Sequence, residues 1–195
     1  MAREKLIAIY DRENWSLWIR GIRLLEICDH YLICFQQNPQ LQAVPDMQLR
    51  KERIYPENLK CCEQQAYSVD RMKEYLMSEP AEGFLYYSEE TGEPVGFLWV
   101  MFRGGNELQY RVRNIDAFGF DFFVFPQYRG RGLIRFMIKD TLRYLEEMHQ
   151  IDKLFASVRR NNEAALNAYR KAGMTVIGRK VFFRIRHCRI PYPCI

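Results

Sequence analysis

The chain has 195 residues, a net charge of +5 and a hydrophobic content of 48%. This length can bury one sizeable core, so we predict a single domain over residues 1–195. The first fifteen residues lack the long apolar stretch of a signal peptide, and no apolar run reaches the roughly 20 residues of a membrane span. We therefore expect a soluble, cytoplasmic protein without a membrane partner.

The positive charge is concentrated at the C-terminal end. Residues 151–195 hold ten Lys and Arg against two acids, whereas the preceding 150 residues carry 19 basic and 22 acidic groups. This skew indicates either an anionic ligand, such as the phosphates of a cofactor or of nucleic acid, or a solvated basic face. Because no nucleic-acid motif is present, we predict no nucleic-acid partner.

The six cysteines do not indicate a metal site or a disulfide framework. They form no Cys-x-x-Cys pair, and two of them are adjacent, which suits neither a metal site nor a disulfide. We interpret them as reduced thiols and predict no bound metal. The cysteines are Cys28, Cys34, Cys61, Cys62, Cys188 and Cys194.

The N-terminal part, residues 1–78, is predicted to be variable and helical. In residues 14–32 apolar side chains recur at the spacing of an amphipathic helix. Residues 36–58 contain three prolines and many polar groups, which indicates loop, and residues 60–78 indicate a second helix that ends before Pro80. The apolar stripe of the first helix consists of Trp15, Trp18, Ile19, Ile22, Leu25 and Cys28.

The predicted core, residues 80–186, begins with extended segments. GFLYYS (83–88) and PVGFLWVMF (94–102) flank a Gly-containing turn and are rich in aromatic and branched residues, which is typical of a β-hairpin. A third extended run lies within residues 108–125. We expect these strands to pair antiparallel.

Helices and strands then alternate. A helical face in residues 133–148 is followed by a strand at 154–158, a helix at 163–172 and a strand at 174–186. Such strand–helix–strand connections imply parallel pairing in the middle of a mixed sheet. The predicted fold class is therefore α/β, an α+β mixed sheet with antiparallel N-terminal strands and flanking helices.

The sequence FPQYRGRG, residues 125–132, leads from a predicted strand into a predicted helix. Its two glycines tolerate positive φ and let a ligand approach the backbone closely. Unpaired amides from Arg129 to Leu133, with the positive end of the helix dipole behind them, are typical of a phosphate site. Arg131 and Arg135 add positive charge. The alternative is a simple tight turn, because the stretch is neither a Walker loop nor a complete dinucleotide fingerprint.

Two stretches of the predicted core resemble the GNAT superfamily of Gcn5-related N-acetyltransferases. FFVFPQYRGRGL (122–133) is similar to the acyl-CoA-binding motif of that family, with Gln127, Gly130 and Gly132 at the matching positions. VRRNNEAALNAYRKAGM (158–174) is similar to the family's strand, asparagine, helix and tyrosine segment. The resemblance implies a GNAT-like acyl-CoA N-acyltransferase fold that uses acetyl-CoA.

In that fold the strand ending near Phe125 and the strand at 154–158 splay apart, and pantetheine lies between them. The resemblance implies that backbone groups of the first strand bond the pantetheine amides, and that the Val124 N–H stabilises the oxyanion. It places the pyrophosphate on the amides of residues 129–133. Asn162 contacts the cofactor arm, or alternatively only caps a helix. The cofactor-binding residues expected in this way are Phe123, Val124, Phe125, Gln127, Arg129, Gly130, Arg131, Gly132, Leu133, Asn162 and Tyr169.

The resemblance also implies that Tyr169 is the general acid that protonates the departing CoA thiolate, the alternative being a packed aromatic. The general base is harder to assign. Relatives often carry a glutamate at the places of Phe118 and Ser157, and neither carboxylate is present here.

Asp121 interrupts an aromatic run and is the candidate catalytic base or substrate anchor, because burial would raise the pKa of its carboxyl group. Strand alternation places it on the face of Phe123 and Phe125, although a bulge would reverse that. The other candidates are Asp116, Glu107 and deprotonation through water. None of His30, His149 and His187 is expected in the site.

These observations predict an N-acetyltransferase that moves an acetyl group from acetyl-CoA to a primary amine of a small molecule or peptide by direct attack. The alternative is a non-catalytic protein of the same fold that binds acyl-CoA or interacts through its basic surface. The identity of the acceptor is left open, and because relatives are often dimers a homodimer is possible.

Overall fold

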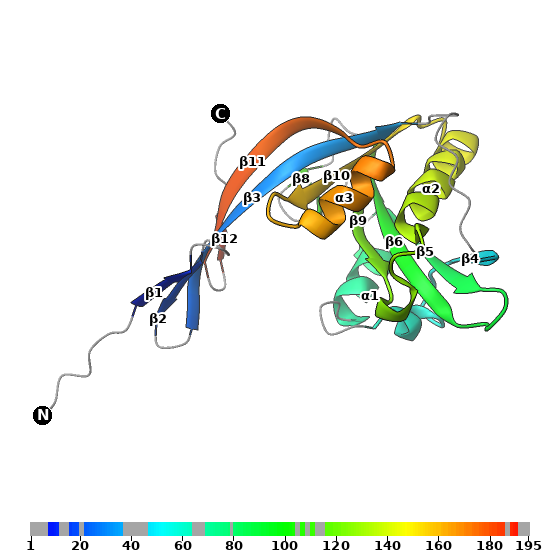
Figure 1. Ribbon diagram of the computed structural model, residues 1–195, viewed down its shortest axis with the longest axis horizontal. Helices are drawn as coiled ribbons and strands as arrows, with labels where there is room; N and C mark the ends of the chain where they lie inside the picture. Colours follow the sequence, from blue (N-terminus) through cyan, green and yellow to red (C-terminus); the bar gives the residue numbers. More distant parts are fainter. Residues whose placement is uncertain are drawn as a thin grey trace, which may run out of the picture.

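The computed structural model shows a mixed sheet with helices on both faces (Figure 1). The predicted α/β fold class is thereby confirmed. The residues that the structure describes are 8–11, 16–19, 22–36, 47–63, 69–78, 80–103, 106–107, 110–111, 116–185 and 188–190.

One sheet holds all the described strands except the short pair β7 (Asn106–Glu107) and β8 (Tyr110–Arg111). Its neighbours follow the order β1-β2-β3-β10-β9-β6-β5-β4, and β11 pairs with β3 and β12. Among the strands that the structure describes, only β9 and β10 pair in parallel. The strands are β1 (Ala8–Asp11), β2 (Ser16–Ile19), β3 (Ile22–Gln36), β4 (Leu49–Arg53), β5 (Ala81–Ser88), β6 (Pro94–Phe102), β9 (Ala117–Val124), β10 (Lys153–Arg159), β11 (Thr175–Ile185) and β12 (Cys188–Ile190).

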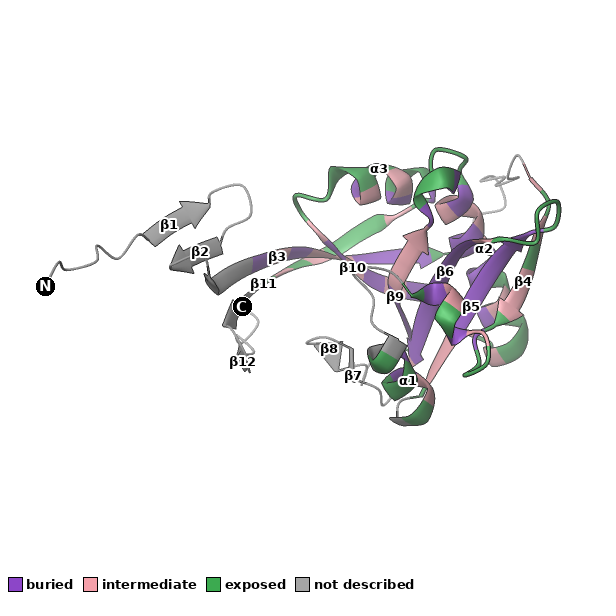
Figure 2. Ribbon diagram, turned by 90° about the horizontal axis from the view of Figure 1, so that it is seen from below, coloured by how far each residue is buried: buried purple, intermediate pink, exposed green. Residues whose placement is uncertain are grey.

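The helices divide between the two faces of the sheet (Figure 2). On one face, Met137 of α2 lies against Gly96 of β6. On the other, Tyr75 of α1 packs against Trp99 of β6, with ring centroids 5.6 Å apart. Because alternate strand residues point to opposite faces, these contacts place α1 and α2 on opposite sides. The helices are η1 (Leu59–Cys62), α1 (Val69–Ser78), η2 (Pro126–Tyr128), α2 (Leu133–His149) and α3 (Glu163–Lys171).

Most elements of the predicted core are confirmed. β5 and β6 form the antiparallel hairpin, and β9 and β10 form the parallel pair. α2 and α3 occupy the predicted helical segments. The helix predicted at 60–78 is present in part, as η1 and α1. Residues 36–58 contain the edge strand β4, whose charged sequence LRKER hid it from the prediction. Charged side chains are common on edge strands because they discourage pairing with another chain.

The helix predicted for residues 14–32 is wrong, since β2 and β3 run through this segment. β3 pairs with β10 on one edge and with β11 on the other. Buried apolar residues lie on both faces of β3, Cys28 and Cys34 on one and Ile33 and Phe35 on the other, so the strand lacks the clear period-2 alternation that identifies a half-buried strand. The branched and aromatic residues of ICDHYLICF (27–35) favour a strand, and tertiary pairing decided the outcome.

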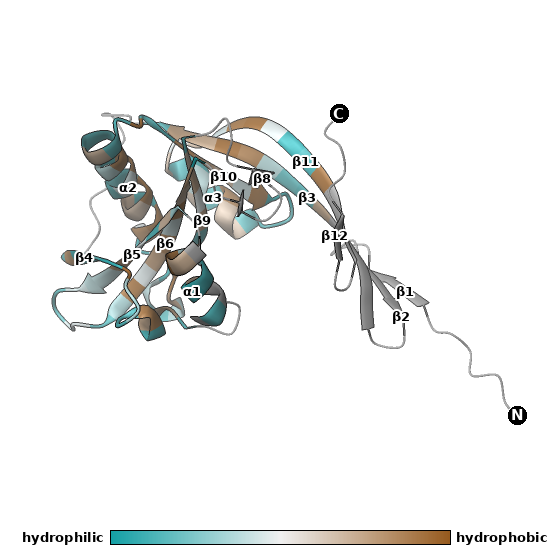
Figure 3. Ribbon diagram, turned by 180° about the vertical axis from the view of Figure 1, so that it is seen from behind, coloured by the Kyte–Doolittle hydropathy of each residue, from teal (hydrophilic) through white to brown (hydrophobic). Residues whose placement is uncertain are grey.

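The N-terminal strand β3 therefore lies between the strands β10 and β11 from the C-terminal part of the chain, and β3 and β11 curve away from the other strands together (Figure 1). Both are banded by hydrophilic and hydrophobic residues (Figure 3). Asp29 of β3 accepts hydrogen bonds from Arg160 Nη1 at 2.7 Å and from Arg179 Nε and Nη2 at 2.8 and 2.7 Å. Side chains thus reinforce a backbone pairing between segments up to 150 residues apart.

Replacing Asp29 with asparagine should remove a pH-dependent part of the stability. Burial by itself raises the pKa of the Asp29 carboxyl, but the bonds and charges of Arg179 and Arg160 outweigh it and hold the pKa below its ordinary value of 3.8. A carboxyl whose pKa is lowered by folding stabilises the fold above its unfolded pKa, and this contribution disappears as pH falls through the folded pKa. In urea unfolding, the difference between wild type and Asp29→Asn should be largest near neutral pH and shrink well below pH 3.8. A difference that is constant with pH would contradict this assignment.

Candidate active site

β9 and β10 pair over only part of their length. Their register contains two pairs, Phe118 with Phe155 and Gly119 with Ala156, although β9 continues to Val124. Strands that remain paired stay about 4.8 Å apart. Beyond Gly119 and Ala156 the two strands therefore part, and backbone groups on their facing edges have no ladder partner across the gap.

A bulge in β9 lies at the start of this opening. Phe120 pairs with Trp99 and Phe123 with Phe97, so β9 advances by three residues while β6 advances by two. Asp121 has a φ of 48°, a left-handed backbone that is uncommon for a residue other than glycine. Such a bulge bends a strand and increases its local twist, which turns β9 away from β10.

The bulge also changes the faces predicted for the aromatic run. Phe120 contacts Tyr75 of α1, whereas Phe122 contacts Tyr169 of α3 on the other face. Phe123 stacks on Phe97 with ring centroids 5.2 Å apart, on the α1 side. Asp121 lies at the bulge, where the faces of the following side chains reverse, and it is half-buried.

Val124 presents its backbone to the opening. The Phe125 N–H donates to the carbonyl of Val95 at 3.0 Å, so Phe125 is bonded to β6. In an antiparallel ladder neighbouring residues alternate, and the N–H and C=O of Val124 therefore point away from β6. Arg129 Nε donates to that carbonyl at 3.1 Å. Of the three residues expected to offer backbone groups to a cofactor, Val124 is the one oriented towards the gap.

The loop before α2 presents a row of backbone amides. Gly130 and Gly132 have φ of 83° and 72°, conformations that a residue with Cβ adopts only under strain. Within the described residues, the amides from Gly130 to Ile134 donate no hydrogen bond, whereas the Arg129 N–H is already bonded to Pro126 O at 3.3 Å. The amides of residues 130–133, which are four of the five expected to bind phosphate, and the amide of Ile134 therefore lie at the positive end of the α2 dipole.

The surroundings of this loop fix it and add charge. Tyr128 is buried, and its hydroxyl donates to Glu93 Oε2 in the β5–β6 turn at 2.6 Å. That hydrogen bond raises the pKa of Tyr128. Gln127, Arg129 and Arg131 are exposed around the loop. A rigid turn of bare amides with neighbouring guanidinium groups is suited to bind phosphate.

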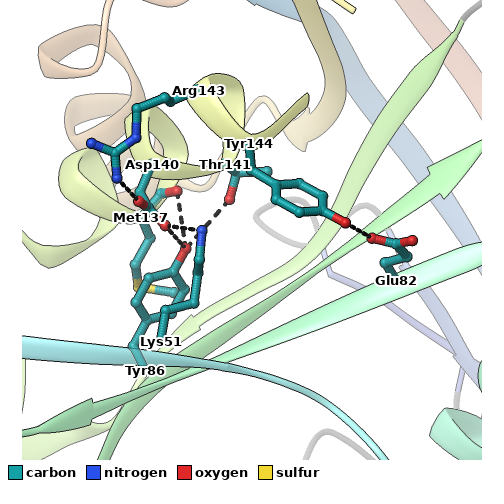
Figure 4. A network of polar contacts seen from close by, with 8 residues as sticks. All are labelled: Lys51, Glu82, Tyr86, Met137, Asp140, Thr141, Arg143 and Tyr144. Atoms are coloured by element: carbon teal, nitrogen blue, oxygen red, sulfur yellow. Dashed lines mark hydrogen bonds and ion pairs between the residues drawn. The ribbon is translucent and has the colours of Figure 1, made fainter. Parts of the chain in front are cut away.

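A buried polar network holds α2 against the sheet (Figure 4). Asp140 of α2 is 8% exposed, and its carboxylate contacts Lys51 Nζ at 2.6 Å and Arg143 Nη2 at 2.7 Å. It also accepts a hydrogen bond from the Tyr86 hydroxyl at 3.0 Å. Burial raises the pKa of Tyr86 well above its ordinary value, and the Asp140 carboxylate adds to this. One turn further along α2, the Tyr144 hydroxyl donates to Glu82 at 2.7 Å.

Replacing Asp140 with alanine should lower the free energy of unfolding by about 3 kcal/mol, because the half-buried Lys51 ammonium and the buried Tyr86 hydroxyl both lose their carboxylate partner. Urea unfolding followed by circular dichroism would measure the loss. The matched control is Asp116→Ala, which removes an exposed ion pair with Arg103 and should change stability by less than about 1 kcal/mol. Equal losses in the two variants would contradict the importance of the network.

Asn162 is the N-cap of α3. Its Oδ1 accepts a hydrogen bond from the Ala165 N–H at 3.1 Å. Such a cap contributes about 1 kcal/mol to stability. The residue is exposed, and its side-chain NH2 has no hydrogen-bond partner among the described residues, so the amide can cap α3 and donate to a ligand at the same time.

Tyr169 projects from α3 onto the sheet between two strands that flank β10. Its ring meets Phe35 of β3 and Phe122 of β9 edge-on, with centroids 5.6 and 5.8 Å away. The residue is 9% exposed. The aromatic packing that was considered as an alternative is thus present, and it fixes the ring beside the opened part of β9.

The expected carboxylate bases are not assembled around the opening. Phe118, one of the two positions at which a glutamate was considered, is a fully buried aromatic residue. Asp116 is exposed and forms an ion pair with Arg103. The side chain of Glu107 lies outside the described residues. Of the carboxylates considered from the sequence, Asp121 is the described one that lies next to the gap.

His30 was excluded by the sequence prediction, yet the structure brings it to Ser157. Its Nδ1 lies 3.5 Å from Ser157 Oγ, 127 residues away in the chain. Because residues 14–32 were predicted to be helical, the contact between His30 and Ser157 was not expected. The sequence signal that could have indicated it is the strand-forming composition of ICDHYLICF. Of the other two histidines, His149 lies against Phe102 and Tyr144, and His187 lies outside the described residues.

The described part of the chain contains no group of His, Cys, Asp and Glu side chains that could hold a metal ion. Cys28, Cys34, Cys61 and Cys62 are free thiols, and burial raises the pKa of Cys62 to about 12. The side chains of Cys188 and Cys194 lie outside the described residues. None of the described helices is long and apolar enough to cross a membrane.

Comparison with known proteins agrees with this geometry. The family model described as acetyltransferase (GNAT) family matches residues 49–174. The chain is 27% identical over 137 residues to a spermine/spermidine N(1)-acetyltransferase from Bacillus subtilis (strain 168), covering 70% of this chain and 82% of that protein. It is 24% identical over 109 residues to an N-alpha-acetyltransferase from Sulfurisphaera tokodaii, covering 55% of this chain and 62% of the relative.

A similar fold occurs in solved structures. A tandem GNAT protein from the clavulanic acid biosynthesis pathway superimposes with a TM-score of 0.58 and 18% identity over 80% of this chain. The chain spans 52% of that longer protein, and this likeness concerns the fold alone. The family match covers the strands that part, the amide loop and α3. The chain therefore belongs to the GNAT family of acetyltransferases.

Proposed function

We propose that this protein is an N-acetyltransferase that transfers the acetyl group of acetyl-CoA to a primary amine. The observation that carries the proposal is the row of unengaged amides from Gly130 to Ile134, at the N-terminus of α2 and beside the strands that part. A diphosphate fits the first feature, and an extended pantetheine arm fits the second. The amine acetyltransferases among its relatives support the reaction class.

In this proposal the loop amides, Arg129 and Arg131 bind the pyrophosphate, and the free side-chain amide of Asn162 donates to the cofactor arm. Acetyl-CoA supplies an activated acetyl group as its thioester. The Val124 N–H, which points into the gap, donates to the thioester carbonyl and stabilises the negative charge that develops when the amine attacks. Tyr169 donates the proton that the departing thiolate takes up.

The test measures free thiol released from acetyl-CoA in the presence of separate primary amines: spermidine, lysine, and a short peptide with a free α-amine. The polyamine and the peptide are chosen because two relatives carry those activities in their names. Release that depends on one of the amines, with the acetylated product seen by mass spectrometry, supports the proposal. Coenzyme A binding without amine-dependent thiol would instead identify a non-catalytic acyl-CoA-binding protein.

A further inference from the structure

We propose that Ser157 takes up the proton of the attacking amine through a bridging water, and that His30 positions the Ser157 hydroxyl and receives the proton through it. This inference rests on the proposed acetyl transfer. It supplies a base at a site whose sequence offers neither of the expected carboxylates. The juxtaposition that carries it is His30 of β3 beside Ser157 of β10, at the point where β10 leaves β9.

Ser157 occupies the position nearest to the start of the gap. It directly follows Ala156, the last residue of β10 that pairs with β9. Its side chain is half-buried. Ser157 is level with Phe120, and Val124, whose N–H holds the thioester carbonyl in the proposed function, lies three ladder positions further along β6, roughly 10 Å away. A single bridging water can therefore join the attacking amine to this hydroxyl.

Ser157 and His30 share the face of the sheet opposite to α3. Phe35 contacts Tyr169 of α3, and strand alternation directs His30, an odd number of residues away in β3, to the other face. Leu154 pairs with Phe35 and shares its face, so Ser157 likewise points away from α3. An amine that attacks from this face is on the same side of the sheet as the Ser157 hydroxyl, while α3 and Tyr169 lie on the side of the departing thiol.

His30 reaches the gap only through Ser157. It lies on β3, across β10 from the gap, and is 8% exposed. When the proton of the neutral imidazole is on Nε2, Nδ1 accepts the Ser157 hydroxyl 3.5 Å away. A buried imidazole behind a half-buried hydroxyl is an arrangement for proton relay, because the hydroxyl can receive one proton as it gives up another.

Two basic side chains flank His30. Arg159 of β10 and Lys180 of β11 occupy the cross-strand positions on either side of it and share its face. Among the described residues, the other titratable group on this face of β3 next to His30 is Cys28, which is buried. The relay uses the neutral form of the imidazole, because only that form has a ring nitrogen that can accept the Ser157 proton.

The neutral amine attacks the thioester carbonyl carbon and forms the C–N bond. The amine proton passes to the bridging water, the water gives a proton to Ser157 Oγ, and the Ser157 hydroxyl proton passes to His30 Nδ1. The C–S bond then breaks, the thiolate takes a proton from Tyr169, and His30 and Tyr169 return to their starting forms by proton exchange with solvent.

The experiment compares Ser157→Ala and His30→Gln with wild type, using the amine from the panel that supports wild-type thiol release. We expect kcat to fall about 100-fold in each variant, with coenzyme A affinity unchanged, because a positioned base contributes at least that factor. The double variant should be no slower than the slower single one, since both changes remove the same relay. The matched controls are Ser88→Ala and His149→Gln, whose side chains are remote from the gap and should leave kcat within about threefold of wild type.

The pH profile separates a relay from a purely structural role. Wild-type kcat at saturating amine should fall as pH drops through the range in which histidine side chains take up a proton, about pH 8 to 5. This acid limb should be absent in His30→Gln. An unchanged kcat in Ser157→Ala, or an acid limb that persists in His30→Gln, would overturn the relay while leaving acetyl transfer intact. Absence of thiol release by wild type with every amine would instead remove the proposed function itself.

Discussion

Replacing both Gly130 and Gly132 with alanine should weaken coenzyme A binding by about 100-fold. Their φ values lie in the left-handed region, and nothing lies within 4 Å of an added Cβ at either position. The new methyl groups would therefore strain the loop and project into the space in front of the amides. Each hydrogen bond to a charged group contributes roughly 1.5–3 kcal/mol, so loss of one or two accounts for this factor. Isothermal titration calorimetry with coenzyme A would measure it.

Gly92→Ala is the matched control for this pair. Gly92 has a φ of 69° and nothing within 4 Å of an added Cβ, but it lies in the β5–β6 turn. All three substitutions should cost about 1 kcal/mol each in stability, because each puts a side chain in a left-handed backbone. Only the loop substitutions should change coenzyme A affinity. A loss of affinity in Gly92→Ala as large as in the loop variant would show that strain alone explains the effect.

Tyr169→Phe should lower kcat by about 100-fold and leave coenzyme A affinity and stability almost unchanged. The ring contacts with Phe35 and Phe122 do not need the hydroxyl, so packing is retained. The loss should appear in steady-state thiol release at saturating acetyl-CoA and amine. A control is Tyr144→Phe on α2, which removes a hydroxyl that donates to Glu82 of β5. If both variants keep wild-type kcat, the departing thiolate takes its proton elsewhere.

The sequence predicted the half of the fold that carries local signals. The hairpin of β5 and β6 has aromatic and branched strands around a glycine turn, and α2 has a clear apolar face. These patterns arise from burial on one side of an element, which sequence periodicity records directly. The glycines of the amide loop were also readable, because positive φ restricts the choice of residue.

The remainder depends on contacts that no local pattern encodes. β3 has buried residues on both of its faces, so its apolar residues follow no period that distinguishes strand from helix. The bulge at Asp121 arises from the register between β6 and β9, and it reverses the faces of the residues that follow. The approach of His30 to Ser157 could not be predicted either, because it depends on residues 22–36 forming a strand that pairs with β10.

The placement of β3 has a consequence for how the chain matures. During synthesis β3 emerges long before the segments that enclose it, because the bonds of Asp29 reach partners 131 and 150 residues further on. Until then both edges of its residues 27–36, which lie beyond the pairing with β2, are open to pairing with other chains, and contacts so distant in sequence form slowly. A nascent chain released before β11 is complete would expose this strand. Translation pauses late in the message should therefore increase aggregation of the protein.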